Sequence, residues 1–222
     1  MRNSLVNAAQ SFRNRPFRTH PVRHHWRLAL SAGLALSLSA CVSLGADIPD
    51  RLLTLTSDER APIGVDALAG SDNRDNTIAI VTPEVPAKLD VLRLPVNVSP
   101  TEVAYLADTI WVEKPARLFR KVLGETLRAK GTKRAILVLD TDEAPLPAGH
   151  YLRGTLKELT FDAQAGEVVV RYDAIRSDLQ GESVTRRFEA RAPAIAEPGS
   201  IGPALNKAVN QVASEVADWV LK

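Results

Sequence analysis

Apolar and polar residues alternate along three segments in the second half of the chain, and a period of two residues predicts strands. Residues 152–161 alternate first, but the phase slips after Leu156, which predicts a β-bulge at Lys157 or Glu158. Residues 184–191 alternate in the same way. Between these segments, alternate apolar residues share one face: Val168, Val170, Tyr172 and Ala174. Consecutive strands joined by short turns predict an antiparallel meander.

Two other segments repeat apolar residues every three or four positions, which is the spacing of amphipathic helices. The first covers residues 115–130, where Pro115 suits the first helical position and Gly131 suits a left-handed C-terminal cap. The second follows a connector that prolines and glycines predict over residues 193–202. Its apolar positions are Leu205, Val209, Val212, Val216 and Trp219, and we interpret the last as a core anchor.

The first half of the chain completes the fold prediction. Residues 52–55 form a compact apolar run, and the polar residues 56–76 predict a long loop. Pro95 marks a sheet edge or a bulge. Strands are predicted over residues 77–81, 89–98 and 135–139. The order of elements predicts an α+β, two-layer domain with a mainly antiparallel sheet and two amphipathic helices on one face.

The first forty residues follow the plan of a bacterial signal peptide. A basic segment ends at Arg27, and the apolar residues 28–38 that follow are too few to span a hydrocarbon core stably. The sequence Leu38-Ser39-Ala40-Cys41 fits a lipobox, in which a peptidase cuts between Ala40 and Cys41 and lipid is attached to the cysteine thiol. We therefore expect an N-acyl diacylglyceryl group, including palmitate, on Cys41.

Two other interpretations of Cys41 are a chance cysteine after an ordinary secretory signal and a buried cysteine of a cytosolic protein. Because Cys41 is the only cysteine and ends the apolar stretch, the lipobox is favoured and a disulfide is excluded. We divide the chain into a signal peptide over residues 1–40, a lipidated tether over residues 41–50 and a domain over residues 51–222.

The calculated pI of about 8.8 is misleading, because six arginines and no acidic residues lie in the first forty positions. Without these six arginines, 22 basic residues face 26 acidic ones, which gives a formal net charge of −4. The mature chain therefore has no general excess of positive charge with which to bind nucleic acid.

The sequence offers little catalytic chemistry. His150 is the only histidine after the signal peptide, so we expect neither a zinc site nor a Cys–His or Ser-His-Asp centre. Ser71-Asp72-Asn73 lacks the other elements of penicillin-interacting enzymes. The acidic residues Asp140, Asp142 and Glu143 lack the spacing of a calcium loop. No phosphate-binding glycine motif occurs. We expect no enzyme activity, no metal and no cofactor.

Basic residues follow the polar side of the first helix: Arg117, Arg120, Lys121 and Arg128. The simplest interpretation is a solvated helix face. The alternative is a surface that contacts anionic lipid or an acidic partner. With Trp111 and Pro115, which introduce the helix, three of these residues (Arg117, Arg120 and Lys121) form the candidate helix-packing and partner face.

The mature chain resembles the ABC-type transport auxiliary lipoprotein family. The resemblance rests on several pieces in order: the lipobox at Cys41, a strand at residues 52–55, a strand at residues 78–81, LDVLRLPV at residues 89–96, Val103-Ala104-Tyr105, Trp111, Pro115 and the two helices. These lipoproteins accompany Mce-type lipid transporters. The resemblance implies a non-catalytic accessory that works with an Mce-domain protein, a permease and an ATPase.

The resemblance also implies a location. Val42-Ser43 follows Cys41 without the aspartate of the usual inner-membrane retention signal, so we expect a lipid anchor in the outer membrane, on its periplasmic face. Phospholipid and further copies of the chain are additional expected partners. The alternative function is that of an envelope assembly lipoprotein that binds an outer-membrane partner protein.

Overall fold

A long antiparallel meander forms the centre of the computed structural model, which describes residues 51–64, 75–132, 136–140 and 148–222. Cys41 and the predicted signal peptide and tether lie outside the described residues. The elements are β1 (Thr77–Ile80), a short 3-10 helix η3 (Ala87–Leu89), β2 (Arg93–Ser99), β3 (Glu102–Ile110), α2 (Pro115–Gly131), β4 (Leu137–Leu139), β5 (His150–Asp162), β6 (Glu167–Asp178), β7 (Ser183–Pro193) and α3 (Pro198–Val220).

The seven described strands form one mixed sheet. The predicted meander is confirmed, since β6 pairs antiparallel with both β5 and β7. On its other side the long strand β5 pairs in parallel with β1 near its start and with β2 near its end. β4 extends the sheet beside β1, and β3 extends it beside β2. The α+β class is therefore confirmed, with parallel pairs added to the antiparallel ones.

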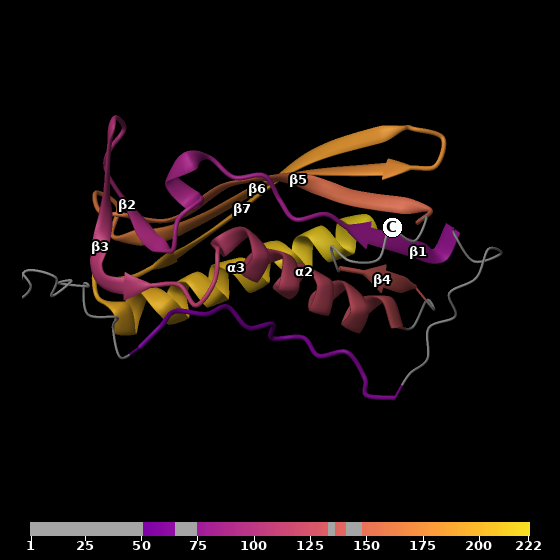
Figure 1. Ribbon diagram of the computed structural model, residues 1–222, viewed down its shortest axis with the longest axis horizontal. Helices are drawn as coiled ribbons and strands as arrows, with labels where there is room; N and C mark the ends of the chain where they lie inside the picture. Colours follow the sequence, from indigo (N-terminus) through magenta and orange to yellow (C-terminus); the bar gives the residue numbers. More distant parts are fainter. Residues whose placement is uncertain (1–50, 65–74, 133–135, 141–147) are drawn as a thin grey trace, which may run out of the picture. The chain divides into compact units, whose positions relative to one another are not determined.

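Both helices cover one face of this sheet, as predicted (Figure 1). The ring of Phe119 in α2 lies 5.0 Å from that of Tyr172 in β6, and Trp219 in α3 lies 5.6 Å from Phe188 in β7. The four rings belong to one hydrophobic core. Burial of a large side chain of this kind contributes about 1.5–3 kcal/mol, so these contacts hold the two layers together.

Local irregularities test several predictions. The bulge in β5 is confirmed, because Leu156 pairs with Tyr172 whereas Glu158 pairs with Arg171, which leaves Lys157 as the extra residue. The register also shifts next to Pro95, but β2 lies between β3 and β5 and is not an edge strand. The run at residues 52–55 makes a single β-bridge, from Leu53 to Trp111, and not a longer strand.

Two predictions about the helix ends are wrong. Gly131 is the last residue of α2 and has no positive φ, and a Cβ there would lie 3.3 Å from Ile136, so close packing accounts for the glycine. The expected connector is shorter than predicted, because α3 begins at Pro198 and continues through Pro203. Proline at the first helical position carries no cost, and burial of Ile201 and Leu205 holds the first turns on the core.

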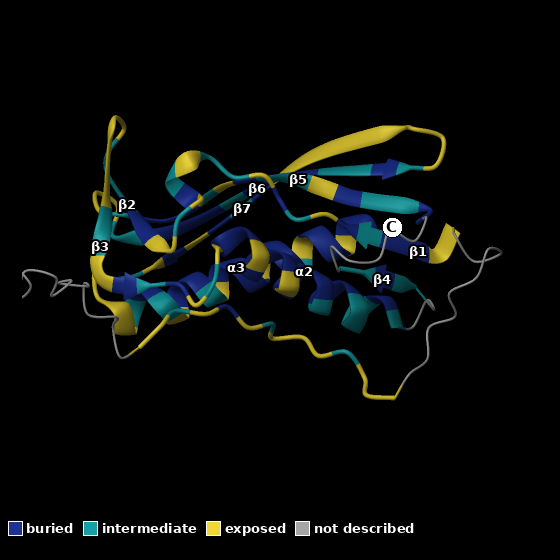
Figure 2. Ribbon diagram, viewed as in Figure 1, coloured by how far each residue is buried: buried dark blue, intermediate teal, exposed yellow. Residues whose placement is uncertain are grey.

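Residues 51–64 form an extended strap along the outside of the helix layer (Figure 1). Most of the strap is exposed, whereas Leu55 is buried (Figure 2). Leu53 of the strap pairs through its backbone with Ile110 and Val112, and beyond it the backbone of the strap is bound by side chains of the two helices. The folded domain therefore begins, after the predicted tether, with a segment fastened to α2 and α3.

Candidate functional site

The residues predicted as a partner face do not form one exposed surface. Trp111 is 1% exposed and lies in the core, and Pro115 is the buried first residue of α2. Arg117 and Lys121 are exposed, and Lys121 forms an ion pair with Glu113. The prediction that Arg120 is solvated is wrong, because this residue is only 8% exposed. Its position on the helix turns it toward the packed side.

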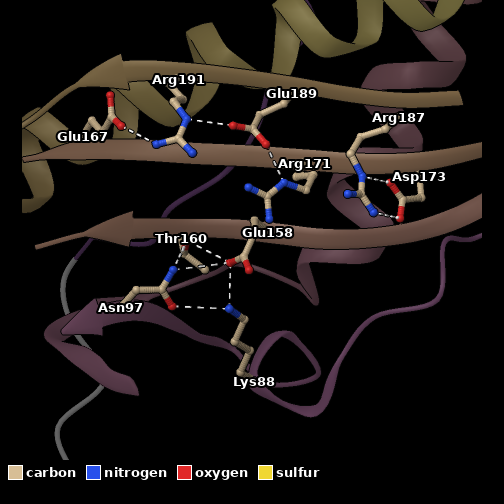
Figure 3. Close-up of polar contacts among 10 residues, drawn as sticks. All are labelled: Lys88, Asn97, Glu158, Thr160, Glu167, Arg171, Asp173, Arg187, Glu189 and Arg191. Atoms are coloured by element: carbon tan, nitrogen blue, oxygen red, sulfur yellow. Dashed lines mark hydrogen bonds and ion pairs between the residues drawn. The ribbon is translucent and has the colours of Figure 1, made fainter. Parts of the chain in front are cut away.

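The clearest concentration of polar side chains lies on the other face of the sheet (Figure 3). Since successive strand residues point to opposite faces, Val168, Val170 and Tyr172 of β6 face the helices. The alternate residues on the opposite face are Glu167, Val169, Arg171 and Asp173, and the three charged ones meet charged residues of β7. The ion pairs are Arg191 with Glu167 and with Glu189, Arg171 with Glu189, and Arg187 with Asp173.

Hydrogen bonds lower the pKa of two acids of this network, Asp173 and Glu189. Arg187 donates to both oxygens of Asp173, at 2.6 and 2.7 Å, and this holds the pKa of that carboxyl below its usual value. Glu189 accepts hydrogen bonds from Arg171 and Arg191, which lower its pKa. Carboxylates that stay charged at neutral pH are poor proton donors, so the network presents fixed, mutually compensated charges.

A second polar cluster fastens the N-terminal elements to the bulge in β5 (Figure 3). Lys88 of η3 lies 2.7 Å from the carboxylate of Glu158, and it also donates to the side chain of Asn97 in β2. Asn97 in turn donates to the hydroxyl of Thr160, which is fully buried. The bulge at Lys157 turns Glu158 toward these partners, so the cluster fixes the position of η3 and β2 against β5.

Two of the sequence candidates for catalysis or metal binding, His150 and Asp140, lie in the described part of the chain. His150 begins β5 and lines a cavity of about 440 Å³ with Arg176 and Lys222 among its other lining residues. Asp140 forms an ion pair with Arg128 of α2. Ser71-Asp72-Asn73, Asp142 and Glu143 lie outside the described residues. Among the residues that the structure describes, no group of three or more His, Cys, Asp or Glu side chains is placed to hold a metal ion.

A second cavity, of about 510 Å³, lies where the strap begins. Its lining includes Leu52 and Leu53 from the strap, Asp108 and Thr109 from β3, and Pro198 from α3. Asp108 has a positive φ of 49°, which is uncommon for a residue other than glycine. This strained residue lies next to the cavity, in the part of β3 where the register with β2 shifts.

The attachment of the strap was not predicted from the sequence. The side chain of Asn206 accepts a hydrogen bond from the backbone N–H of Thr56 at 2.8 Å, and that of Asn210 accepts one from Asp58 at 2.8 Å. On α2, Glu125 accepts from the N–H of Ala61 at 2.8 Å. A polar asparagine at position 210, among the apolar positions of the last helix, is the sequence feature that could have indicated this role.

These features define a two-layer α+β domain with a charge-paired outer sheet face and a fastened N-terminal strap. A similar fold occurs in an uncharacterised protein of known crystal structure, with a TM-score of 0.59 and 13% identity over 77% of this chain and 99% of the other. A Xanthomonas campestris protein of the DUF330 family is also similar, with a TM-score of 0.60 and 14% identity over 77% of this chain and 95% of the other.

Residues 61–217 match the family described as the ABC-type transport auxiliary lipoprotein component. The chain belongs to this family, as the sequence resemblance predicted. No curated protein matches the sequence. The chain is therefore a lipoprotein-family component associated with ABC transport. None of the helices in the described part of the chain is long and apolar enough to cross a membrane.

Proposed function

We propose that this chain is a non-catalytic, lipid-anchored accessory of an Mce-type ABC lipid transport system, held at the periplasmic face of the outer membrane. The observation that carries the proposal is the family match over residues 61–217, which covers most of the folded domain. The lipobox ending at Cys41 supplies the anchor. An Mce-domain protein, a permease and an ATPase, all made by other genes, supply substrate binding, passage and energy.

The anchor supports this assignment physically. Each buried CH₂ of a lipid chain contributes about 0.8 kcal/mol, so a cysteine with two or more acyl chains stays in its leaflet. The tether then leads into the strap at Arg51, and Asn206 and Asn210 hold the strap on α3. A pull between the membrane and the domain is thus borne first by the bridge of Leu53 to Trp111 and then by the hydrogen bonds to α3.

The exposed basic residues of α2 support a contact with the transport machinery or its cargo. Arg117 and Lys121 lie one turn apart on the exposed side of this helix. A juxtamembrane basic residue contributes about 1 kcal/mol toward an anionic lipid surface. These two residues therefore replace the longer predicted stripe as the candidate contact for phospholipid headgroups or an acidic partner.

The test is affinity purification of the intact lipoprotein from solubilised envelopes, followed by protein and lipid mass spectrometry. We expect the Mce-domain protein, the permease and the ATPase to co-purify, with phospholipid. Recovery of neither phospholipid nor an Mce-type partner would overturn the proposal. Recovery of an outer-membrane assembly protein instead would support the alternative function of an envelope assembly lipoprotein.

Two variants separate the anchor from the partner contact. Cys41→Ser removes the acylated thiol, so we expect the protein in the soluble periplasmic fraction. An unchanged membrane fraction would contradict lipidation as the anchor. Arg117→Glu with Lys121→Glu should keep the anchor but reduce the recovered partner or lipid, whereas Arg153→Glu, an exposed change on β5, is the matched control.

A further inference from the structure

The described sheet has three edges, and two of them are protected against pairing with another strand. β4 is only three residues long. β7 carries Arg186, Arg187 and Arg191 and ends at Pro193. Short edge strands, charged side chains and proline are the usual means by which proteins prevent unwanted strand addition.

The third edge, β3, lacks these protections along most of its length. It pairs with β2 on one side only, within the part of the chain that the structure describes. Residues 103–107 are Val-Ala-Tyr-Leu-Ala, an uncharged run in which Val103 is 44% exposed. An edge of this kind presents a row of unpaired backbone donors and acceptors. The run ends at Glu102 on one side and at the strained Asp108 on the other.

The chain itself binds an extended segment just beyond this run. The N–H of Leu53 donates to the carbonyl of Ile110 at 2.8 Å, and the N–H of Val112 donates to the carbonyl of Leu53 at 2.9 Å. Between them, the N–H of Trp111 donates to Leu92, which precedes β2. Leu53 therefore pairs on the side of the chain that faces away from β2, so an extended residue is bound on that side at Trp111.

The charges at the two ends of the run indicate the occupant. Glu102 and Asp108 are both exposed, and neither forms an ion pair among the described residues. A second copy of β3, paired antiparallel about Tyr105, would place Glu102 opposite Asp108 of the other copy at both ends. Like charges directly opposite each other destabilise a strand pair. A strand with basic residues six positions apart would instead meet a carboxylate at each end.

We propose that the outer edge of β3, over residues 102–108, binds an extended segment of a partner protein by strand addition. The segment has uncharged residues at its centre and a basic residue near each end. Backbone hydrogen bonds supply the affinity, and the two carboxylates supply the selection. This inference rests on the edge alone, so it stands or falls independently of the transport assignment.

The test uses the intact lipoprotein in detergent micelles and a labelled, end-capped peptide, Lys-Thr-Val-Thr-Val-Thr-Lys, with binding followed by fluorescence anisotropy. We expect saturable binding, a peptide with glutamates at both ends to bind about tenfold more weakly, and a peptide with a central proline not to bind. Glu102→Gln with Asp108→Asn should remove the preference for lysine-ended over glutamate-ended peptides without preventing binding. Because the variant still binds peptide, a loss of preference is then not caused by a folding defect.

Val103→Lys should weaken binding about tenfold, since it adds a charge to the open edge. Val184→Lys on β7 is the matched control, because Val184 is 50% exposed on an edge that is already protected. Absence of binding to the wild-type protein, or equal effects of the two lysine variants, would overturn the proposal. Self-association in analytical ultracentrifugation that only Val103→Lys abolishes would also overturn it and identify a second copy as the occupant.

Discussion

The side-chain amide of Asn210 donates a hydrogen bond to the backbone carbonyl of Thr56 at 2.8 Å. The same side chain accepts a hydrogen bond from the N–H of Asp58, also at 2.8 Å. One residue of α3 thus makes both of the hydrogen bonds that a neighbouring strand would make to the strap. Because Asn210 is 8% exposed, these bonds are shielded from competing water.

Replacing Asn210 with alanine should release the strap. Thr56 and Asp58 each lose a partner, and an unmade bond of this kind costs about 1–3 kcal/mol in unfolding free energy. We expect lower stability in urea and faster proteolytic cleavage within residues 56–64. Gln211→Ala, an exposed change at the next position of α3, is the control. Equal cleavage rates in the two variants would show that Asn210 does not hold the strap.

Arg176 should stabilise the end of α3, although it belongs to β6. Its guanidinium donates to the carbonyls of Trp219 and Val220 at 3.1 and 3.4 Å and lies 5.3 Å from the centre of the Trp219 ring. The last turn of α3 has no basic residue of its own, so Arg176 supplies the cation that favours a helix C-terminus.

Arg176→Met keeps much of the aliphatic side chain but removes these bonds and the charge. We expect a loss of about 1–2 kcal/mol in unfolding free energy by urea denaturation. The unfolding free energy of Arg176→Lys should lie between those of Arg176→Met and the wild type, since lysine retains the charge but lacks the planar donor group. Arg153→Met on β5 is exposed and should change little. A similar loss from both methionine variants would argue against the capping role.

The periodicity of apolar residues determines some features of this fold and leaves others open. The buried face of β6 and the bulge at Lys157 follow from alternation and its phase slip, so both were predicted. The parallel pairing of β1 and β2 with β5 was not, because periodicity states which face is buried and not which strand lies beside it. The start of α3 was not predicted because of Pro198 and Pro203, although Pro198 suits the first helical position and burial of Ile201 outweighs the effect of Pro203.

The candidate site was less predictable than the fold. The lipobox identified Cys41 from local sequence alone, but that prediction remains untested by residues the structure describes. Arg120 was assigned to the solvent side of its helix because charge is usually exposed, and the structure buries it. The ion pairs between β6 and β7 depend on strand register. The sequence feature that could have indicated these ion pairs is the presence of opposite charges at alternate positions of the two strands, such as Asp173 and Arg187.

The Asp173–Arg187 pair should make stability depend on pH in the acid range. The pKa of Asp173 is lowered in the folded protein, chiefly by hydrogen bonds from Arg187, so the unfolded chain takes up a proton first as pH falls. The stabilising contribution is therefore present above the ordinary Asp value of 3.8 and is lost as pH falls through the lower folded value.

A double-mutant cycle measures this effect directly. Asp173→Asn, Arg187→Met and the double variant should reveal a favourable coupling energy in urea unfolding at pH 7. We expect that coupling to shrink steadily below about pH 4, and to shrink at neutral pH when salt is added, because the pair is largely exposed. A coupling energy that stays constant down to pH 2.5 would contradict the assignment of the lowered pKa to this pair.

Gly154 of β5 should not accept a side chain without a loss of stability. It lies opposite Ala174 of β6 with a φ of +156°, and a Cβ there would lie 2.1 Å from the backbone carbonyl of Asp173 and 3.0 Å from the ring of Tyr172. Because the clashing atom is backbone, β5 and β6 must separate to accept a methyl group.

Gly154→Ala should therefore cost at least about 1–3 kcal/mol in unfolding free energy, the range for local backbone strain, measured in urea. Substitutions at two other glycines separate the effect of backbone strain from that of the steric clash. Gly181 has a φ of +86° with open space around it, so Gly181→Ala reports strain without a clash. Gly199 lies in α3 with open space, so Gly199→Ala should stabilise the protein by up to about 1 kcal/mol. If Gly154→Ala costs no more than Gly181→Ala, the close approach of β5 to β6 does not limit this position.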